Sequence, residues 1–265
     1  MALLSLSMLG TLQATQDGEP LTDFKSDKVR ALLVYLAVVS GPPHRREALA
    51  GLLWPEWPDR EARRSLRDAL SNLRRAIGDH DAVPRFLLIT SETVQFNRGS
   101  EYRSDVAAFT DLRGKQDLSD LQQAVALYRG SFLEGFSIGD AAPFEEWALL
   151  KREQLGRQML QTLHSLAAIH EQQGEYGQAQ SYARRQVQLE PWNEEAHQQL
   201  MRVLALGGQR SAALAQYQAC RRLLADELRV EPSRETVALF ESIRDETLLP
   251  AAPGLVTAEE LPAPG

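Results

Sequence analysis

The sequence predicts a mainly α fold in two parts, an α+β domain at the N-terminus and an all-α repeat domain behind it. Within the first 105 residues, short alternating strands, three helical stretches and a hairpin follow one another, which is the element order of a winged helix-turn-helix. From residue 106 the apolar pattern is helical and repeats after 34 residues. We therefore expect a winged helix-turn-helix over 1–105, a tetratricopeptide-like domain over 106–247 and a flexible, proline-rich tail over 248–265.

Strand signals open the chain. Leu4, Leu6 and Met8 alternate with serines, the period-two pattern of a half-buried strand. A second run over 12–15 leads into Asp17-Gly18, a strong hairpin-turn dipeptide. These patterns predict a small antiparallel sheet at the N-terminus.

Three helices and a second hairpin are expected next. Ser26 can cap the first helix, and Gly41-Pro42-Pro43 ends it. The second helix should cover Arg45 to Leu53, and the third should cover Arg60 to Ile77 and end at Gly78. The apolar runs 86–89 and 94–96 flank polar residues and predict the hairpin that serves as a wing.

The C-terminal part shows an internal repeat. Gly174 matches Gly208 and Ala179 matches Ala213, while Pro191 closes the first unit. This spacing is that of tetratricopeptide repeats, in which a small alanine lets the two helices of a hairpin approach closely. The expected helices are 117–130, 143–173, 175–189, 193–206, 209–227 and 233–247.

The third helix carries the chemistry that indicates a function. Six arginines lie between residues 60 and 75, against only two acidic residues. Arginine donates two parallel hydrogen bonds to phosphate or guanine, asparagine reads adenine in the same way, and aspartate accepts from cytosine. The residues expected on the face opposite the apolar side are Arg60, Arg64, Arg67, Asp68, Ser71, Asn72 and Arg75.

This face is predicted to bind DNA, with arginines on phosphates and the central polar residues on bases. The wing adds Thr90, Thr93 and Arg98 near its tip or end. A charged helix face is often only solvated surface, so a plain surface role stays open beside the DNA-binding one.

Composition narrows the class of protein further. Residues 1–105 hold 14 Lys and Arg against 14 Asp and Glu, so the net charge of −7 resides in the remainder and DNA binding is expected in the front half.

The single cysteine, Cys220, and the lack of signal-peptide or membrane-span patterns favour the cytoplasm. We find no catalytic or nucleotide-binding motif and no metal-ligand spacing among His164, His170 and His197, and we expect neither an enzyme nor a cofactor.

Several separated motifs resemble the antibiotic regulatory protein (SARP) family. The N-terminal part is similar to the effector domain of OmpR-type response regulators, and the following part is similar to the bacterial transcriptional activator domain. The resemblance covers residues 3 to 247. The motifs that carry it are Lys28-Val29-Arg30-Ala31-Leu32-Leu33, residues 45–55, residues 66–75, Phe132-Leu133-Glu134-Gly135, Phe144-Glu145-Glu146-Trp147 and residues 189–197.

The resemblance implies a transcriptional activator that binds direct repeats in double-stranded promoter DNA, as a homodimer on the DNA, and recruits RNA polymerase. The base-reading positions of OmpR-type helices correspond to Asp68 and Asn72, where this chain departs from the usual residues. The preferred DNA sequence therefore cannot be carried over. The competing hypothesis is a helical-repeat scaffold that binds a protein partner through aromatic residues, with a winged domain that is only structural.

Overall fold

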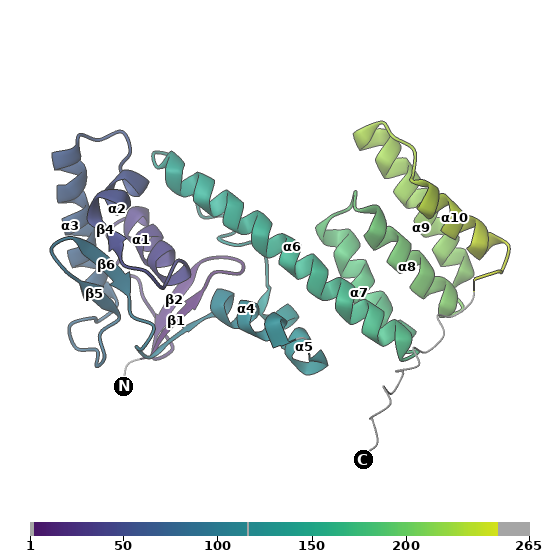
Figure 1. Ribbon diagram of the computed structural model, residues 1–265, viewed down its shortest axis with the longest axis horizontal. Helices are drawn as coiled ribbons and strands as arrows, with labels where there is room; N and C mark the ends of the chain where they lie inside the picture. Colours follow the sequence, from purple (N-terminus) through teal and green to yellow (C-terminus); the bar gives the residue numbers. More distant parts are fainter. Residues whose placement is uncertain (1–2, 116, 249–265) are drawn as a thin grey trace, which may run out of the picture. The chain divides into compact units, whose positions relative to one another are not determined.

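The computed structural model describes residues 3–115 and 117–248, and the chain forms two compact units, residues 1–159 and 160–265. Helices dominate both, and the only sheets of the described part lie in the first unit (Figure 1). No helix of the described ranges combines the length and the apolar character needed to cross a membrane. From residue 249 the expected tail lies outside the described residues.

Two small sheets form in the first unit. The N-terminal sheet has the strand order β3-β2-β1-β7, in which β7 runs parallel to β1. The second sheet has the order β4-β6-β5, and its β5–β6 hairpin is the predicted wing. The strands are β1 (Leu4–Ser7), β2 (Gln13–Gln16), β3 (Glu19–Pro20), β4 (His44–Arg45), β5 (Leu87–Ile89), β6 (Thr93–Phe96) and β7 (Tyr102–Ser104).

The predicted helix-turn-helix is confirmed in the first unit. The expected three helices are α1 (Asp27–Val38), α2 (Arg46–Leu53) and α3 (Asp59–Ala76). The buried side of α3, which includes Leu66, Leu70 and Leu73, packs against α1 and α2. Gly78 follows α3 with a φ of 61°, the left-handed conformation that a helix-ending glycine tolerates. Ser26 stands at the N-cap of α1, but its side chain makes no capping hydrogen bond there.

Strand β7 and the helix after it are elements that the sequence pattern did not predict. Helix α4 (Asp105–Lys115) starts directly after β7 and is followed by α5 (Leu118–Leu127). The Asp105 carboxylate accepts hydrogen bonds from the backbone N–H groups of Met8 and Leu9 at 2.8–3.0 Å and pairs with Arg129 at 2.9 Å. These bonds fix the start of α4 to the end of the first strand.

The long helix α6 (Ala142–Gln172) contains the division between the two units, at Met159. In its first half, the Trp147 ring contacts Tyr35 of α1 edge-on, with 4.9 Å between the ring centroids. Helices α4 and α5 and the start of α6 belong to the first compact unit. The domain boundary at residue 105 stays a prediction.

The second unit contains the predicted repeats. Beyond α6 its helices are α7 (Tyr176–Leu189), α8 (Glu194–Leu206), α9 (Arg210–Leu223), the π-helical turn η1 (Leu224–Leu228) and α10 (Arg234–Arg244). Gly174 and Gly208 both adopt left-handed φ angles, 74° and 77°, and so end the first helix of each pair at equivalent places. Ala179 and Ala213 are completely buried, as close helix packing requires. The mainly α fold class, winged helix-turn-helix followed by tetratricopeptide-like helices, is therefore confirmed.

The end of the second repeat is longer than that of the first. Helix α9 continues into η1, and Arg229 then reverses the chain in a left-handed conformation with a φ of 60°. Tyr217 of α9 stacks on Phe240 of α10 with 4.1 Å between the ring centroids, so α10 packs against the core of this unit. The expected longer second helix is thus present, with its extra residues in a π-helical turn.

Candidate nucleic-acid interface

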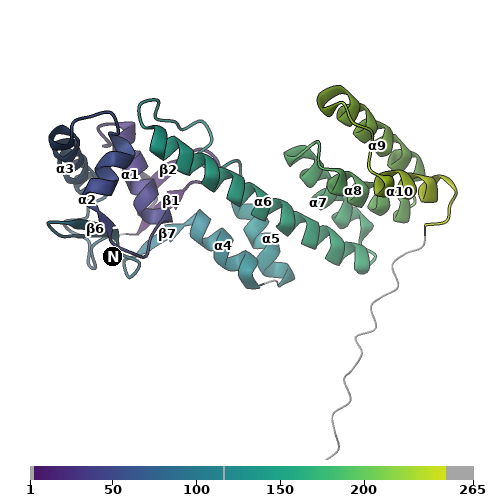
Figure 2. The same cartoon turned by 45° about the horizontal axis from the view of Figure 1, so that its top comes forward.

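One side of α3 forms an exposed polar stripe at the edge of the first unit. Helix α3 lies away from α4 and α5 in both views of this unit (Figures 1 and 2). Successive members of the stripe are three or four residues apart, so they share one face over about 22 Å of helix axis. The exposed residues on it are Arg60, Arg64, Arg67, Ser71 and Arg75, with Asp68 on its flank.

The arginines of this stripe are free to bind a ligand. Arg60, Arg64, Arg67 and Arg75 form no salt bridge and no hydrogen bond with any other residue in the described ranges. By contrast, Arg63 pairs with Glu47 at 2.8 Å, and Arg74 pairs with Asp79 at 2.9 Å. The protein thus leaves uncompensated guanidinium groups along a single helix face, which favours binding of phosphate.

Asp68 and Ser71 lie near the middle of α3 and are also exposed. Asp68 has no basic partner among the described side chains, so its carboxylate can accept hydrogen bonds from a ligand. The arginines surround these two shorter side chains along the helix. This is the order of residue types expected where helix ends contact the backbone of DNA and the centre contacts base edges.

Asn72 does not lie on the exposed face, and the expectation that it does is wrong. Its side chain is only 4% exposed. The Oδ1 atom accepts a hydrogen bond from the backbone N–H of Lys25 at 2.9 Å, and Nδ2 donates to the carbonyl of Asp23 at 3.1 Å. Helical periodicity places Asn72 at the border of the apolar side, and the loop before α1 covers it. This geometry does not favour a base contact by Asn72.

Among the wing residues predicted from sequence, Thr90 and Arg98 have separate roles. The Thr90 hydroxyl accepts hydrogen bonds from the N–H groups of Glu92 and Thr93 and therefore shapes the tip of the hairpin. Arg98 follows β6, and its Nε donates to the hydroxyl of Ser40 at 3.1 Å, while its Nη2 donates to the Ser40 carbonyl. Thr90 lies at the tip of the wing, whereas Arg98 fixes the base of the wing to the turn after α1.

A groove joins the wing to α3. It has a volume of about 540 Å³. Its walls come from the wing tip, from the start of α2 and from the N-terminal half of α3. The lining residues are Arg45, Arg46, Glu47, Arg63, Leu66, Arg67, Ser91, Glu92 and Thr93.

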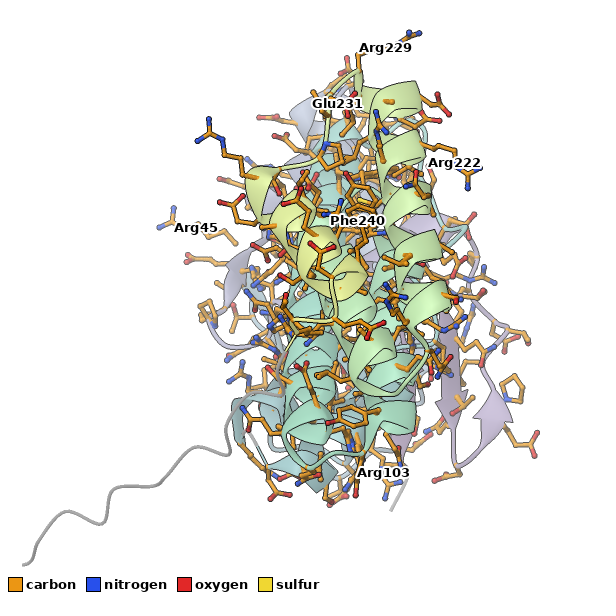
Figure 3. The ribbon with its side chains drawn as sticks, turned by 90° about the vertical axis from the view of Figure 1, so that its right-hand side faces the viewer. Arg45, Arg103, Arg222, Arg229, Glu231 and Phe240 are labelled. Carbon is orange, nitrogen blue, oxygen red and sulfur yellow. The ribbon has the colours of Figure 1, made fainter. Side chains whose placement is uncertain are left out.

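Arg45, Arg46 and Arg63 are groove residues that the sequence reasoning did not select. Arg46 donates to the carbonyl of Thr90 at 3.0 Å and so holds the wing tip against α2. Arg45 extends away from the ribbon into solvent (Figure 3). The tandem arginines at the start of α2 were the available signal, but only the pairing of β4 with β6 brings them to the wing.

Comparison with known proteins identifies the family. Residues 95–244 match the family "Bacterial transcriptional activator domain". The chain belongs to this family. It is also 29% identical over 254 residues to the transcriptional regulatory protein EmbR of Mycobacterium tuberculosis, covering 91% of this chain and 63% of EmbR. It is 31% identical over 240 residues to the regulatory protein AfsR of Streptomyces coelicolor, covering 86% of this chain and 23% of AfsR.

A solved structure of one relative shares the fold over most of this chain. The structure of M. tuberculosis EmbR in complex with a low-affinity phosphopeptide superimposes with a TM-score of 0.75 at 25% identity, over 94% of this chain and 67% of that one. In the sequence comparisons, the chain spans under two thirds of the length of EmbR and about a quarter of the length of AfsR. These relatives agree with the resemblance to SARP regulators that the sequence motifs indicate.

His197 and Cys220 of the activator domain are buried and engaged in packing. His197 lies 2.7 Å from the carbonyl of Pro191 and 2.7 Å from the Gln216 amide nitrogen, and burial lowers its pKa. Burial also raises the pKa of the Cys220 thiol to about 11, which suppresses its reactive thiolate form. In the part of the chain that the structure describes, no group of three or more His, Cys, Asp or Glu side chains could hold a metal ion.

Proposed function

We propose that this chain is a sequence-specific DNA-binding transcriptional activator. The observation that carries the proposal is the row of unpaired arginines on α3, beside a wing and a groove lined by further arginines. A face of this kind, on the second helix of a helix-turn-helix, suits the major groove of double-stranded DNA. Family membership supports a role in transcription.

Each residue of the face has a proposed role. Arg60, Arg64, Arg67 and Arg75 hold phosphates, with Arg45 at the groove as an addition. Asp68 and Ser71 contact base edges, and Asp68 suits the amino group of cytosine. The wing tip around Thr90 approaches the flanking backbone.

The later steps of activation follow from the family and form part of the proposal. The chain binds direct repeats as two protomers and recruits RNA polymerase, and this function places it with the chromosome in the cytoplasm. The activator domain supplies surfaces for protein contacts, as helical repeats commonly do.

A salt titration tests the function directly. Binding is measured to the DNA upstream of the gene that encodes this chain and to a random duplex of the same length. We expect promoter binding to persist at salt concentrations that remove binding to the random duplex, because only base contacts distinguish the two. Equal loss from both duplexes would contradict sequence-specific recognition. No binding to either at low salt would favour the scaffold hypothesis instead.

Asp68→Ala is expected to change sequence preference with little effect on the salt dependence. Asp68 carries no positive charge, so its removal releases no phosphate contact, while discrimination at one base pair should fall by about 1–3 kcal/mol. Affinity for a set of single-base variants of the bound site measures this. Ser65→Ala, at a half-buried position of the same helix, is the matched control and should leave the preference unchanged. An unchanged preference in Asp68→Ala would remove Asp68 from the base-reading set.

A further inference from the structure

The loop before α1 is attached to α3 by a buried amide. Asn72 accepts from the backbone N–H of Lys25 at 2.9 Å and donates to the carbonyl of Asp23 at 3.1 Å. Both ends of the amide are therefore occupied by one short loop, and the Asn72 side chain is 4% exposed. An amide bonded in this way sets the position of a loop along the helix and is not available to a ligand.

The attachment point lies beside the arginine face. Asn72 is four residues after Asp68 and three before Arg75, so it is a helical neighbour of both. The backbone of Lys25 reaches Asn72, and this places Lys25 next to that edge of α3. The Lys25 side chain is exposed and forms no salt bridge among the described residues.

Lys25 lacks an ion-pair partner among the described residues, whereas Lys28 of α1 has one. Lys28 pairs with Asp140 at 2.8 Å and lies over the rings of Trp54 and Trp57, so its ammonium group is already engaged within the protein. The unpaired ammonium of Lys25, on a flexible stem, is suited to bind a phosphate as a point charge. The exposed carboxylate of Asp23 is on the same loop and reduces the local positive potential without pairing with Lys25.

From this geometry we infer that Lys25 is a further DNA-backbone contact and that Asn72 is the residue that positions it. The inference rests on the proposed DNA-binding function and extends the face from α3 to the loop before α1. Asn72 acts through Lys25, so its removal should resemble the loss of a phosphate contact. It should not resemble the loss of a base contact.

The test measures affinity by fluorescence anisotropy, using a labelled mixed-sequence duplex of about three helical turns. Lys25→Ala should lower affinity about five-fold at physiological salt and reduce the slope of log affinity against log salt by about 0.9. Lys115→Ala, at an exposed lysine that ends α4 and pairs with Asp120, is the matched control and should change neither quantity.

A double-variant cycle then separates the two roles of Asn72. If Asn72 positions Lys25, then Asn72→Ala should reduce the salt slope in the wild-type background and have no further effect in Lys25→Ala. A base-reading Asn72 would instead alter the ratio of affinities for two different duplexes, equally in both backgrounds. Thermal melts of each variant show whether the fold is kept; Lys25→Ala, a change at an exposed side chain, provides the test if Asn72→Ala does not fold.

Different outcomes would contradict the role of Lys25 and Asn72 and the proposed DNA-binding function. Wild-type protein that binds no duplex at low salt overturns the proposed function and the inference with it. Wild-type binding with an unchanged salt slope in Lys25→Ala overturns the inference alone. Additive effects of Asn72→Ala and Lys25→Ala overturn the positioning role, whereas the expected non-additive result supports both parts.

Discussion

Replacing Arg64 and Arg67 together with alanine is expected to weaken binding to every duplex about 30-fold at physiological salt. Both guanidinium groups are exposed and unpaired in the described structure, so no internal interaction is lost with them. Each phosphate contact contributes about 0.9 to the slope of log affinity against log salt, and the double variant should lose about 1.8. Anisotropy titrations across a range of salt concentrations measure both quantities on the same samples.

Arg157→Ala provides the matched control for this variant. Arg157 is an exposed helical arginine of the same unit, 67% accessible at its side chain, but it lies on α6 and pairs with Glu153. It should leave affinity and slope unchanged. If the Arg64 and Arg67 double variant bound like the wild type, α3 would not be the docking face. The solvated-surface interpretation of its charges would then be correct.

The helix ends show why much of this fold could be predicted from sequence. Gly78, Gly174 and Gly208 each follow a helix in a left-handed conformation that glycine adopts without steric cost, so the residue type itself marks the boundary. The Asp17-Gly18 turn follows the same logic, with φ angles of 52° and 91°. Such signals are local, and they need no knowledge of what packs against the element.

The misplaced and unpredicted parts depend on contacts between distant segments. Asn72 is polar and lies on a helix, which favours an exposed position, yet a loop 47 residues earlier covers it. Strand β7 has three residues, and its parallel partner β1 is almost a hundred residues away, so neither length nor alternation reveals it. The groove arginines of α2 become part of the site only through strand pairing. Sequence periodicity therefore predicts the helix that carries the site, while tertiary contacts decide which of its side chains can reach DNA.

Asp79→Ala is expected to lower the free energy of unfolding of the first unit by about 3 kcal/mol. The Asp79 carboxylate is completely buried, pairs with Arg74 of α3 at 2.9 Å and accepts from the backbone N–H of Leu87, at the start of the wing, at 2.9 Å. Alanine leaves that N–H without its partner and removes the counter-charge of Arg74. Urea unfolding followed by tryptophan fluorescence measures the loss, because Trp54, Trp57 and Trp147 all lie in this unit.

Two further variants test why Asp79→Ala is destabilised, and DNA binding by Asp79→Ala tests the role of the wing. Asp79→Asn keeps an acceptor for the Leu87 N–H but loses the charge, so it should be less destabilised than Asp79→Ala. Asp81→Ala, two residues away and exposed, should unfold like the wild type. The Asp79 carboxylate joins the end of α3 to the first wing strand. Asp79→Ala protein that is still folded should therefore bind DNA more weakly, and its salt slope should fall because phosphate contacts from the wing are lost. A destabilised Asp79→Ala with wild-type affinity and slope would mean that α3 binds DNA without help from the wing.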